Sequence, residues 1–549
     1  MRKLRILIAT ILLLSVIAIA AKEPAERYFQ IAKNLDIFAT LFKEVNAYYV
    51  DEVDPDKLIR AGIDSMLASL DPYTNYIPEE DIESFRTMTT GQYAGIGALI
   101  GRVEGKILIT MPYDGFAAHE AGLRIGDQLL EIDGEDVKDF EISEISALLK
   151  GQVRTQVEVT VKRYGEANPI KFSIQREKIT VNNVPYYGLV TPQIGYIRLE
   201  DFTTNAGKEV EKAVKDLKNQ GAEKLILDLR DNPGGLLSEA VNVSNVFIPK
   251  GKEVVSTKGK VTEWNKTYKT LNNPEDTKIP LVVLADGGSA SASEIVSGVI
   301  QDYDRGILLG TKTFGKGLVQ TTRPLTYNSQ LKVTTAKYYI PSGRCIQALD
   351  YAHRNKDGSA SKVHDSLKVE YKTKNGRRVY DGEGLSPDIK VIYQNYATIT
   401  EVLVRKGLIF EYATIYAYEN EVGADPTKFQ FSDEDYDRFV TWLVNKDYSY
   451  TTDVERRVKE LESLSKEEKY YNDIKVQLSQ LRKEIARSKQ NDLIDFKEEI
   501  VQLLREEILT RKFLQKGAIE GSFQHDKQIQ KAVNVLNDQS LYQKTLSSN

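Results

Sequence analysis

Cysteine and histidine are two of the residue types of which this chain of 549 residues has very few. Its single cysteine, Cys345, excludes an intramolecular disulfide framework and a thiolate-rich metal site. Its four histidines are His119, His353, His364 and His525. A mechanism that needs a histidine base, or a metal site with several histidine ligands, would have to draw on these four residues.

An excess of charge of one sign is also lacking. The chain has 74 basic and 79 acidic residues, which gives a net charge of −5. This nearly even balance does not favour a nucleic-acid-binding protein, which would usually be strongly basic. The composition is otherwise that of a globular protein, with 41% hydrophobic and 28% charged residues, which excludes wholesale disorder. At about 150 residues per domain, the length predicts three to four domains.

Long hydrophobic runs are absent except at the N-terminus. Residues 1–5 include three basic residues, and residues 6–21 form an unbroken run of 16 apolar or small residues that Lys22 ends. This pattern is typical of a secretory signal peptide, and the run is short for a membrane span of about 20 residues. An uncleaved N-terminal anchor is the alternative. Both interpretations predict an exported chain, in the periplasm or at the outer face of the cytoplasmic membrane, with membrane contact only through this segment if it stays uncleaved.

The periodicity of apolar residues divides the rest of the chain. Residues 22–86 carry apolar positions at three- and four-residue spacing and predict a helical region. Residues 87–178 are rich in glycine and in short β-branched runs, and predict a small β-rich domain. Residues 179–394 alternate strands and helices, which predicts an α/β layer with crossover connections, and the polar stretch 348–380 within them is expected to be an inserted loop. Residues 395–549 predict a helical domain.

Within this C-terminal region, two features are specific. Ser432 and Asp435 have the spacing of a capping box at the start of a helix. Residues 453–513 are dense in charged residues, with apolar positions such as Leu478 and Leu481 at helical spacing. A solvated helical bundle is the simpler interpretation of this stretch, and a coiled-coil site for a partner is the alternative.

Residues 121–137, AGLRIGDQLLEIDGEDV, resemble a PDZ domain. PDZ domains bind a chain terminus by adding it as a strand to the edge of their own sheet. In that arrangement the backbone amides near Gly95, Ile96 and Gly97 would meet the terminal carboxylate. A small β-fold without a ligand is the alternative, and His119 is expected to be a surface or helix residue and not a catalytic group.

The stretch from Leu281 to Gln320 is the most informative about chemistry. A buried strand is followed by a glycine turn, by three serines that alternate with alanines, and by a helix with Glu294 in its first turn. A serine at a strand-to-helix turn lies at the ligand-binding edge of an α/β sheet. The N-terminus of the helix favours negative charge, which suits a developing oxyanion.

A serine hydroxyl is a weak nucleophile and needs an adjacent base. The nearby sequence offers no histidine, and Lys316 is the next candidate. A lysine acts as a base only when it is neutral, and burial lowers its pKa in that direction. Gln320 would share a face with Lys316 in an extended strand and could orient its amine without adding charge. On residue types alone, close packing of small residues and a solvated lysine remain the plain alternative.

Six motifs along the chain resemble those of the carboxy-terminal processing (tail-specific) serine proteases, in the order of that family and over roughly residues 30–392. The resemblance implies an α/β crotonase-like protease core with an inserted β-rich PDZ domain, plus N-terminal and C-terminal helical regions, and a Ser–Lys dyad. The motifs are GYIRLEDF (195–202), LILDLRDNPGG (225–235), GSASASE (288–294), TFGKGLVQ (313–320), YYIPSGRCIQ (338–347) and GLSPDI (384–389).

The resemblance also implies roles for single residues. The family nucleophile corresponds to Ser291, its base to Lys316 and its glutamine to Gln320, which leaves Ser289 and Ser293 as structural serines. These catalytic positions include no histidine.

Three further groups of residues follow from the resemblance. The oxyanion donors would be the backbone amides of Ala292, Gly234 and Gly235. Asp302 matches a recurrent family position, where a structural carboxylate and a catalytic one are both open. Lys150 stands where some members carry an arginine that senses the carboxylate of the substrate, and lysine keeps the charge but lacks the bidentate fork.

The implied function is a serine endopeptidase that cleaves exported or misfolded proteins near their C-termini, with the PDZ domain holding the substrate C-terminus. No metal or cofactor is implied, and Cys345 falls in a structural motif. Whether an adaptor lipoprotein delivers substrates, and whether the helical ends form a homo-oligomer, stays open. A catalytically inactive exported PDZ scaffold is the alternative. An acyl-CoA enzyme on a similar core is a third interpretation, which the PDZ segment and the export signal disfavour.

Overall fold

The computed structural model of the protein describes residues 26–392 and 396–547. The chain divides into two compact units, each of which is described by itself. The predicted signal peptide or anchor at residues 1–21 lies outside the described residues. Within the described ranges, no helix is both long enough and apolar enough to cross a membrane.

The smaller unit holds the described residues up to Tyr76 together with Thr322–Val333. Residues 26–48 are helical, and α2 follows at Pro55–Ala68. Within the predicted helical region 22–86, this unit thus holds helices at residues 26–48 and 55–68, whereas Asn75–Ile77 forms the short strand β1.

A small antiparallel sheet forms the first part of the larger unit, which holds Ile77–Thr321 and Thr334–Asn549. Its strands are ordered β3-β4-β5-β7-β8, so β3 is an edge strand. Val157, Val159 and Val161 are fully buried along β7, and this face of the sheet packs on a core that includes α5. The elements of this part are α3 (Ile82–Thr90), β2 (Gln92–Gly95), β3 (Ala98–Val103), β4 (Lys106–Pro112), α4 (Ala117–Glu120), β5 (Gln128–Ile132), β6 (Glu135–Asp136), α5 (Ile142–Leu149), β7 (Gln156–Lys162), β8 (Ile170–Gln175) and β9 (Glu177–Thr180).

A six-stranded sheet, ordered β10-β11-β12-β15-β16-β23, forms the centre of the larger unit. Its strands are parallel except for β10. Both faces are buried, because Leu225 and Leu227 of β12 join one core cluster and Ile226 between them joins another. The strands are β10 (Tyr186–Thr191), β11 (Ile194–Arg198), β12 (Lys224–Asp228), β15 (Leu281–Ala285), β16 (Ile307–Gly310) and β23 (Ile389–Lys390).

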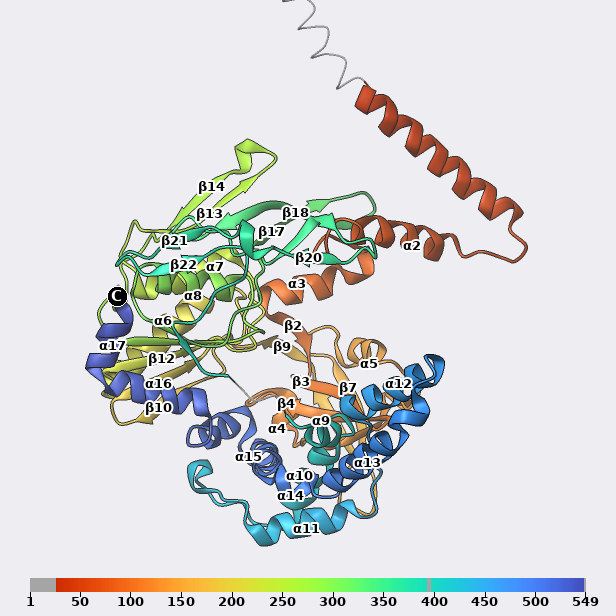
Figure 1. Cartoon of the computed structure of the whole chain (residues 1–549), viewed down its shortest axis with the longest axis vertical. Coiled ribbons are helices and arrows are strands. Elements are labelled where there is room, and N and C mark those ends of the chain that lie inside the picture. The colour runs from red at the N-terminus through yellow and green to blue at the C-terminus, as the bar shows by residue number, and fades with distance from the viewer. Residues whose placement is uncertain (1–25, 393–395, 548–549) are drawn as a thin grey trace, which may run out of the picture. The chain divides into compact units, whose positions relative to one another are not determined.

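Helices cover both faces of this sheet (Figure 1). One face carries α6 (Ala206–Asn219), α7 (Leu237–Phe247) and α8 (Ala292–Asp302). The other carries α16 (Lys527–Asn537) and α17 (Gln539–Leu546), the last two helices of the chain. The C-terminal end of the sequence therefore completes the core of the α/β layer.

The polar stretch at residues 348–380 contains two short antiparallel hairpins and is not the plain loop that its composition predicts. The second hairpin has buried positions, since Val379 is 7% exposed and Thr373 is 5% exposed. The hairpin strands are β19 (Leu349–Arg354), β20 (Ala360–Lys362), β21 (Glu370–Lys372) and β22 (Arg378–Tyr380). The remaining strands outside the central sheet are β1 (Asn75–Ile77), β13 (Glu253–Gly259), β14 (Lys266–Lys269), β17 (Leu318–Pro324) and β18 (Gln330–Tyr339).

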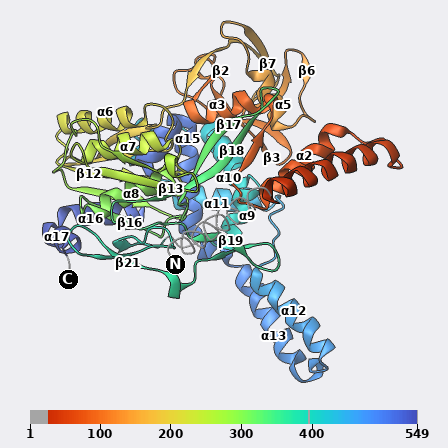
Figure 2. The same ribbon diagram turned by 90° about the horizontal axis from the view of Figure 1, so that it is seen from above.

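A helical region precedes α16. The capping box predicted at Ser432 is confirmed: the Asp435 carboxylate accepts the Ser432 N–H at 2.9 Å and the Asp435 N–H donates to the Ser432 hydroxyl at 3.1 Å. Helices α12 and α13 project as a hairpin with few buried side chains (Figure 2). The helices are α9 (Thr398–Arg405), α10 (Leu408–Glu419), α11 (Asp433–Leu443), α12 (Asp453–Glu467), α13 (Tyr471–Lys489), α14 (Asp492–Asp495) and α15 (Lys497–Ser522).

Candidate functional site

A glycine turn and a serine turn meet at the carboxyl ends of β12 and β15. A Cβ atom added to Gly234 would lie 2.8 Å from the Ala292 nitrogen and 2.9 Å from the Ser291 Cβ, so only glycine permits this approach of the two backbones. Gly234 also has a φ of +95°. The adjacent Gly235 lies against the backbone of Phe202, whose carbonyl oxygen would be 2.6 Å from an added Cβ. The two turns are therefore packed together as one site.

Asn232 ties the glycine turn to the serine turn. Its backbone carbonyl accepts the Ala290 N–H at 3.0 Å and the Ser293 hydroxyl at 2.9 Å. Its side-chain amide donates to the Leu199 carbonyl at 2.7 Å, and its side-chain oxygen accepts the Gly234 N–H at 2.8 Å. Because Asn232 is fully buried, these bonds hold both turns in one arrangement.

The structure distinguishes the three backbone amides that the resemblance implies as oxyanion donors. The Gly234 N–H is already bonded to Asn232. In the described part of the chain, the amides of Ala292 and Gly235 donate to no protein acceptor, and Gly235 is exposed. The geometry therefore favours Ala292 and Gly235 over Gly234 as the open donors.

The three serines before α8 differ in what their hydroxyls do. Ser289 and Ser293 are fully buried and donate to the carbonyls of Leu229 and Asn232, at 2.8 and 2.9 Å. Ser291 is half-buried, and its hydroxyl donates to no carbonyl among the described residues. Ser291 also has a φ of +54°, a strained conformation for a residue with a side chain and one that often marks a functional site.

Glu294, in the first turn of α8, links the Ser291 turn to the loop of Lys316. One carboxylate oxygen accepts the N–H of Ser291 at 3.0 Å and that of Lys316 at 2.9 Å. The other accepts the N–H of Gly315 at 2.8 Å and the Thr313 hydroxyl at 2.6 Å. Burial raises the pKa of Glu294 to about 7, and the hydrogen bonds oppose that rise. We refer to Glu294 with its four donors as the Glu294 clamp.

The sequence did not identify Glu294 as a functional residue, although a signal for it exists. Ser291 and Glu294 have the S-x-x-E spacing of a capping box, and the Ser291 N–H does bond to the Glu294 carboxylate. The bonds from Gly315 and Lys316 have no counterpart in that motif. They depend on a loop more than 20 positions along the chain, which local spacing does not place.

The spacing of Lys316 and Gln320 predicts that they share a face of one strand, but the structure does not place them on one strand. Lys316 is in the loop before β17, which begins at Leu318, and Gln320 is within β17. The Gln320 side-chain amide donates to the Thr334 hydroxyl of β18 at 3.1 Å. The strand β18 also reaches the Ser291 turn, since the Tyr338 hydroxyl donates to the Ser291 carbonyl at 3.2 Å.

Asp302 lies at the opposite end of α8 from Ser291. Its carboxylate is buried, accepts the Ser342 N–H at 2.9 Å and pairs with the Arg344 guanidinium at 2.8 Å. At 1.5 Å of rise per residue, the length of α8 separates Asp302 from the Ser291 turn by about 15 Å. The structural interpretation of Asp302 is therefore favoured over a catalytic one.

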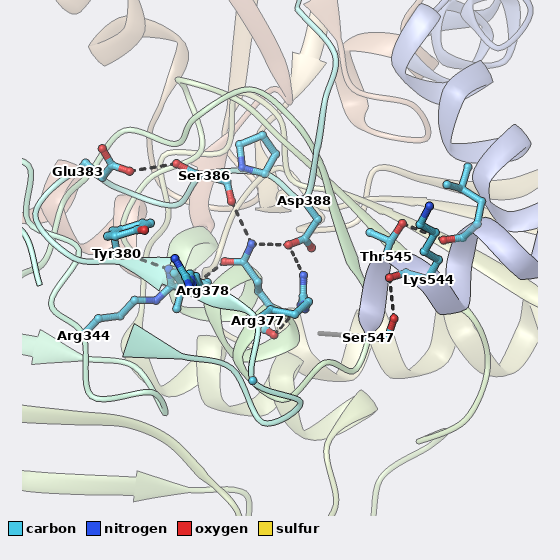
Figure 3. Close-up of a pocket in the computed structure, with 15 residues that line it drawn as sticks. Arg344, Arg377, Arg378, Tyr380, Glu383, Ser386, Asp388, Lys544, Thr545 and Ser547 are labelled. Carbon is cyan, nitrogen blue, oxygen red and sulfur yellow. Dashed lines mark hydrogen bonds and ion pairs between the residues drawn. The ribbon is translucent and has the colours of Figure 1, made fainter. Parts of the chain in front are cut away.

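A cavity of about 790 Å³ opens at this same end of α8 and is lined by neither Ser291 nor Lys316 (Figure 3). Its acidic side chains are already paired. Glu383 forms ion pairs with two lysines, and Asp388 accepts from Arg377 and Gln301. This cavity is thus separate from the meeting of the glycine and serine turns.

The turn Gly95–Gly97 leads into the edge strand β3. The carbonyls of Ile96 and Gly97 accept backbone bonds at 2.8 Å, which hold the turn, whereas their N–H groups donate to no acceptor among the described residues. Gly97 has a φ of +77°. Two open amides therefore precede a strand that has one unpaired edge.

Lys150 lies beside this turn. The neighbouring Gly151 N–H donates to the Ala94 carbonyl at 3.3 Å, and the Lys150 ammonium is 5.5 Å from the centre of the Tyr93 ring. A cation on a segment that is bonded to β2, just before this turn, suits an anionic ligand. The structure thus brings together the four residues predicted for binding in this region: Gly95, Ile96, Gly97 and Lys150.

Three family models match the chain. Peptidase family S41 matches residues 193–352, a PDZ domain matches residues 108–163, and the C-terminal helical domain of a probable PDZ-protease matches residues 399–536.

Curated relatives extend these matches. A carboxy-terminal-processing protease of Bartonella bacilliformis is 39% identical over 322 residues, which cover 58% of this chain and 73% of the relative. A probable CtpA-like serine protease of Staphylococcus aureus is 38% identical over 349 residues, which cover 62% of this chain and 69% of the relative.

Solved structures are similar as well. The photosystem II D1 C-terminal processing protease is 28% identical, with 65% of this chain and 92% of that chain covered and a TM-score of 0.35. The PDZ domain of a carboxy-terminal protease from Vibrio cholerae, solved in complex with a peptide, is 24% identical, with 16% of this chain and 99% of that chain covered and a TM-score of 0.16.

Proposed function

The chain belongs to the carboxy-terminal-processing proteases of peptidase family S41, and on that premise we propose that it cleaves polypeptides near their C-termini with a Ser291–Lys316 dyad. The observation that carries the proposal is the Glu294 clamp. It joins the backbone of Ser291 to the backbone of Lys316. Of the three serines before α8, Ser291 is the one whose hydroxyl donates to no buried carbonyl among the described residues. Two open amides, those of Ala292 and Gly235, belong to the same site.

In the proposed mechanism, neutral Lys316 accepts the proton of the Ser291 hydroxyl as its oxygen attacks the peptide carbonyl. The amides of Ala292 and Gly235 donate to the oxyanion of the tetrahedral intermediate. Lys316 then gives the proton to the leaving amine, and an acyl-enzyme remains on Ser291. Water releases the acyl group with Lys316 again as the base. Gln320, fixed by its bond to Thr334, orients the Lys316 amine.

The proposed substrate is an exported or misfolded chain, held by its C-terminus. The terminal segment adds as a strand to the open edge of β3, and its carboxylate meets the amides of Ile96 and Gly97. Lys150 supplies a positive charge beside them. The signal-like segment at residues 1–21 supports an exported location. A PDZ scaffold without catalysis would need the same binding surface but would show no turnover.

Blocking the substrate carboxylate should weaken cleavage. An unstructured polypeptide with an amidated C-terminus should have a KM about tenfold higher than the same polypeptide with a free C-terminus, because a charge-assisted contact worth about 1.4 kcal/mol or more is lost. Lys150→Ala should raise the KM for the free form and leave that for the amidated form unchanged. Steady-state cleavage measured by chromatography of the products checks both effects.

Lys171→Ala is the matched control, since Lys171 is exposed on β8 at the opposite edge of the same sheet. It should leave both KM values unchanged. Equal KM values for the free and amidated substrates would contradict the proposed role of the PDZ domain, and no cleavage of either substrate would contradict the proposed function as a whole.

Cleavage should slow as the pH falls below about 7. Burial raises the pKa of Glu294 to about 7, and all four groups that face its carboxylate are donors. Protonation would remove one acceptor position and loosen the Glu294 clamp. The need for a neutral Lys316 acts in the same direction. The measurement is kcat at saturating substrate from about pH 5 to about pH 9.

Unfolding would not explain this loss. The pKa of Glu294 is above its ordinary value of 4.5, so the folded state binds this proton more tightly than the unfolded state. The stability that Glu294 contributes is thus present at low pH and is lost as the pH rises through about 7. Thermal unfolding across the same range separates the two effects. A kcat that stays constant down to about pH 5 would contradict the clamp.

A further inference from the structure

A buried network of charges lies directly before the glycine turn. Asp228, the last residue of β12, is fully buried. Its carboxylate accepts the Arg230 guanidinium, with the Nε at 2.9 Å, and the Tyr196 hydroxyl at 2.7 Å. Burial disfavours the charged form, but Arg230 and Arg198 hold the pKa of Asp228 well below its usual range. The carboxylate is therefore ionised and fixes one end of the Arg230 side chain.

The other end of the Arg230 side chain is held by residues almost 300 positions later. Its Nη1 donates to the Asp526 carboxylate at 2.7 Å and to the side-chain oxygen of Gln528 at 3.3 Å. Asp526 also caps α16, because its carboxylate accepts the N–H of Gln528 at 2.8 Å and that of Ile529 at 3.0 Å. Arg230 and Asp526 are both buried, at 7% and 6% exposure.

Arg230 belongs to the turn that carries an open amide. Asn232 follows two positions later and bonds to the Ser291 side of the site, and Gly235 follows five positions later. Asp231, which lies between Arg230 and Asn232, is exposed and has a φ of +59°. The buried anchors of the turn are therefore Arg230 at its start and Asn232 in its middle.

We propose that Asp526 is a positioning residue for the oxyanion site: through Arg230 it fixes the turn that presents the Gly235 amide. This proposal rests on the proposed proteolytic function and deepens it. Oxyanion donors act only within about 2.7–3.1 Å of the developing charge. A shift of about 1 Å in a catalytic group can cost about 100-fold in rate. The helix α16 is thereby part of the catalytic apparatus, and not only a cover of the sheet.

Asp526→Asn tests this assignment in the full-length chain. Asparagine still caps α16 but replaces the anionic acceptor of Arg230 with a neutral one. We expect kcat to fall about tenfold or more, with KM changed less than about twofold, because the change affects the transition state and not substrate binding. Asp538→Asn is the matched control. Asp538 caps α17 through the Leu541 N–H at 2.9 Å, its side chain shows no bond to the glycine turn, and this variant should keep native kcat.

A second readout separates positioning from loss of folded protein. A peptide boronate forms a tetrahedral adduct on the serine that mimics the oxyanion. Its inhibition constant should rise in Asp526→Asn by the same factor by which kcat/KM falls. A purely structural role would lower the concentration of active sites and leave the inhibition constant native. Native kcat and a native inhibition constant in Asp526→Asn would overturn the proposal.

A second variant and a comparison with Ser291→Ala cover the cases in which Asp526→Asn does not fold or the unaltered chain does not cleave. If Asp526→Asn does not fold, Gln528→Ala removes the weaker acceptor of the same guanidinium without touching the cap. It should lower kcat about threefold and raise the inhibition constant equally, and native values there would overturn the proposal. If the unaltered chain shows no more cleavage than Ser291→Ala, the proposed function fails. If the unaltered chain cleaves and Asp526→Asn cleaves equally well, only the proposed role of Asp526 fails.

Discussion

Ser291→Ala should reduce peptide cleavage by about 10⁴-fold or more, and Lys316→Ala should do the same. Each change removes one partner of a unit that acts together, so the double variant should be no worse than either single variant. Both chains should stay folded. The Ser291 hydroxyl donates to no buried carbonyl, and the Lys316 contact with the Glu294 clamp uses the backbone N–H, which alanine keeps.

The neighbouring residues provide matched controls. Ser293→Ala deletes a hydroxyl that donates to Asn232, so it should cost about 1 kcal/mol of stability but leave cleavage within about tenfold of native. Lys312→Ala deletes a half-exposed ammonium that pairs with Glu383, and surface pairs of this kind contribute about 0–1 kcal/mol.

Two measurements on all four single variants decide the outcome. One is analysis of the products cleaved from an unstructured polypeptide, and the other is thermal unfolding of each variant. Full cleavage by Ser291→Ala or Lys316→Ala would refute the dyad. If the unaltered chain also gave no turnover while it bound substrate C-termini, the scaffold alternative would be supported.

The location of this site could be predicted from sequence because its main signals are local. A buried strand, a run of small residues and Glu294 fall within about one strand and one helix turn. The use of each amide could not be predicted in the same way. Gly234 and Gly235 are adjacent and identical in type, and only their packing shows that Asn232 occupies the Gly234 amide and leaves the Gly235 amide open.

The fold shows the same division between local and distant information. Strands such as β12 and helices such as α8 follow from apolar runs and periodicity. The periodic residues of α16 predict an amphipathic helix but do not show which surface it covers, and Ile529 in fact joins the core of the central sheet. Likewise, no local pattern relates Asp526 to Arg230, because the contact joins residues 296 positions apart. Polar composition alone also concealed the hairpins in residues 348–380.

Glu294→Gln should lower kcat by about 100-fold or more and also destabilise the fold. The carboxylate is surrounded by four donors and is fully buried. An amide replaces one acceptor oxygen by a donor, so two of the four donors would face an N–H group. Each unsatisfied buried group costs about 1–3 kcal/mol, which predicts a loss of about 2–6 kcal/mol if the backbone does not relax. Relaxation would move Ser291 away from Lys316, and the rate would fall.

Glu239→Gln isolates this effect from the general cost of altering a buried glutamate. Glu239 lies in the first turn of α7, is 8% exposed, and accepts the Gly207 N–H at 2.9 Å and the Asn242 side chain at 3.1 Å. It holds no residue of the proposed dyad. We therefore expect Glu239→Gln to lower the unfolding temperature while kcat stays within about twofold of native.

The pH dependence of the Glu294 variant supplies the decisive comparison. Glutamine does not titrate, so any part of the decline in kcat near pH 7 that comes from Glu294 should disappear in Glu294→Gln, and only the part that comes from Lys316 should remain. The Glu239 variant should keep the native profile. If Glu294→Gln lost stability but kept native kcat at saturating substrate, the clamp would be a structural contact only. A lower kcat with an altered profile, at a temperature where the variant is folded, would instead place Glu294 in control of the distance between nucleophile and base.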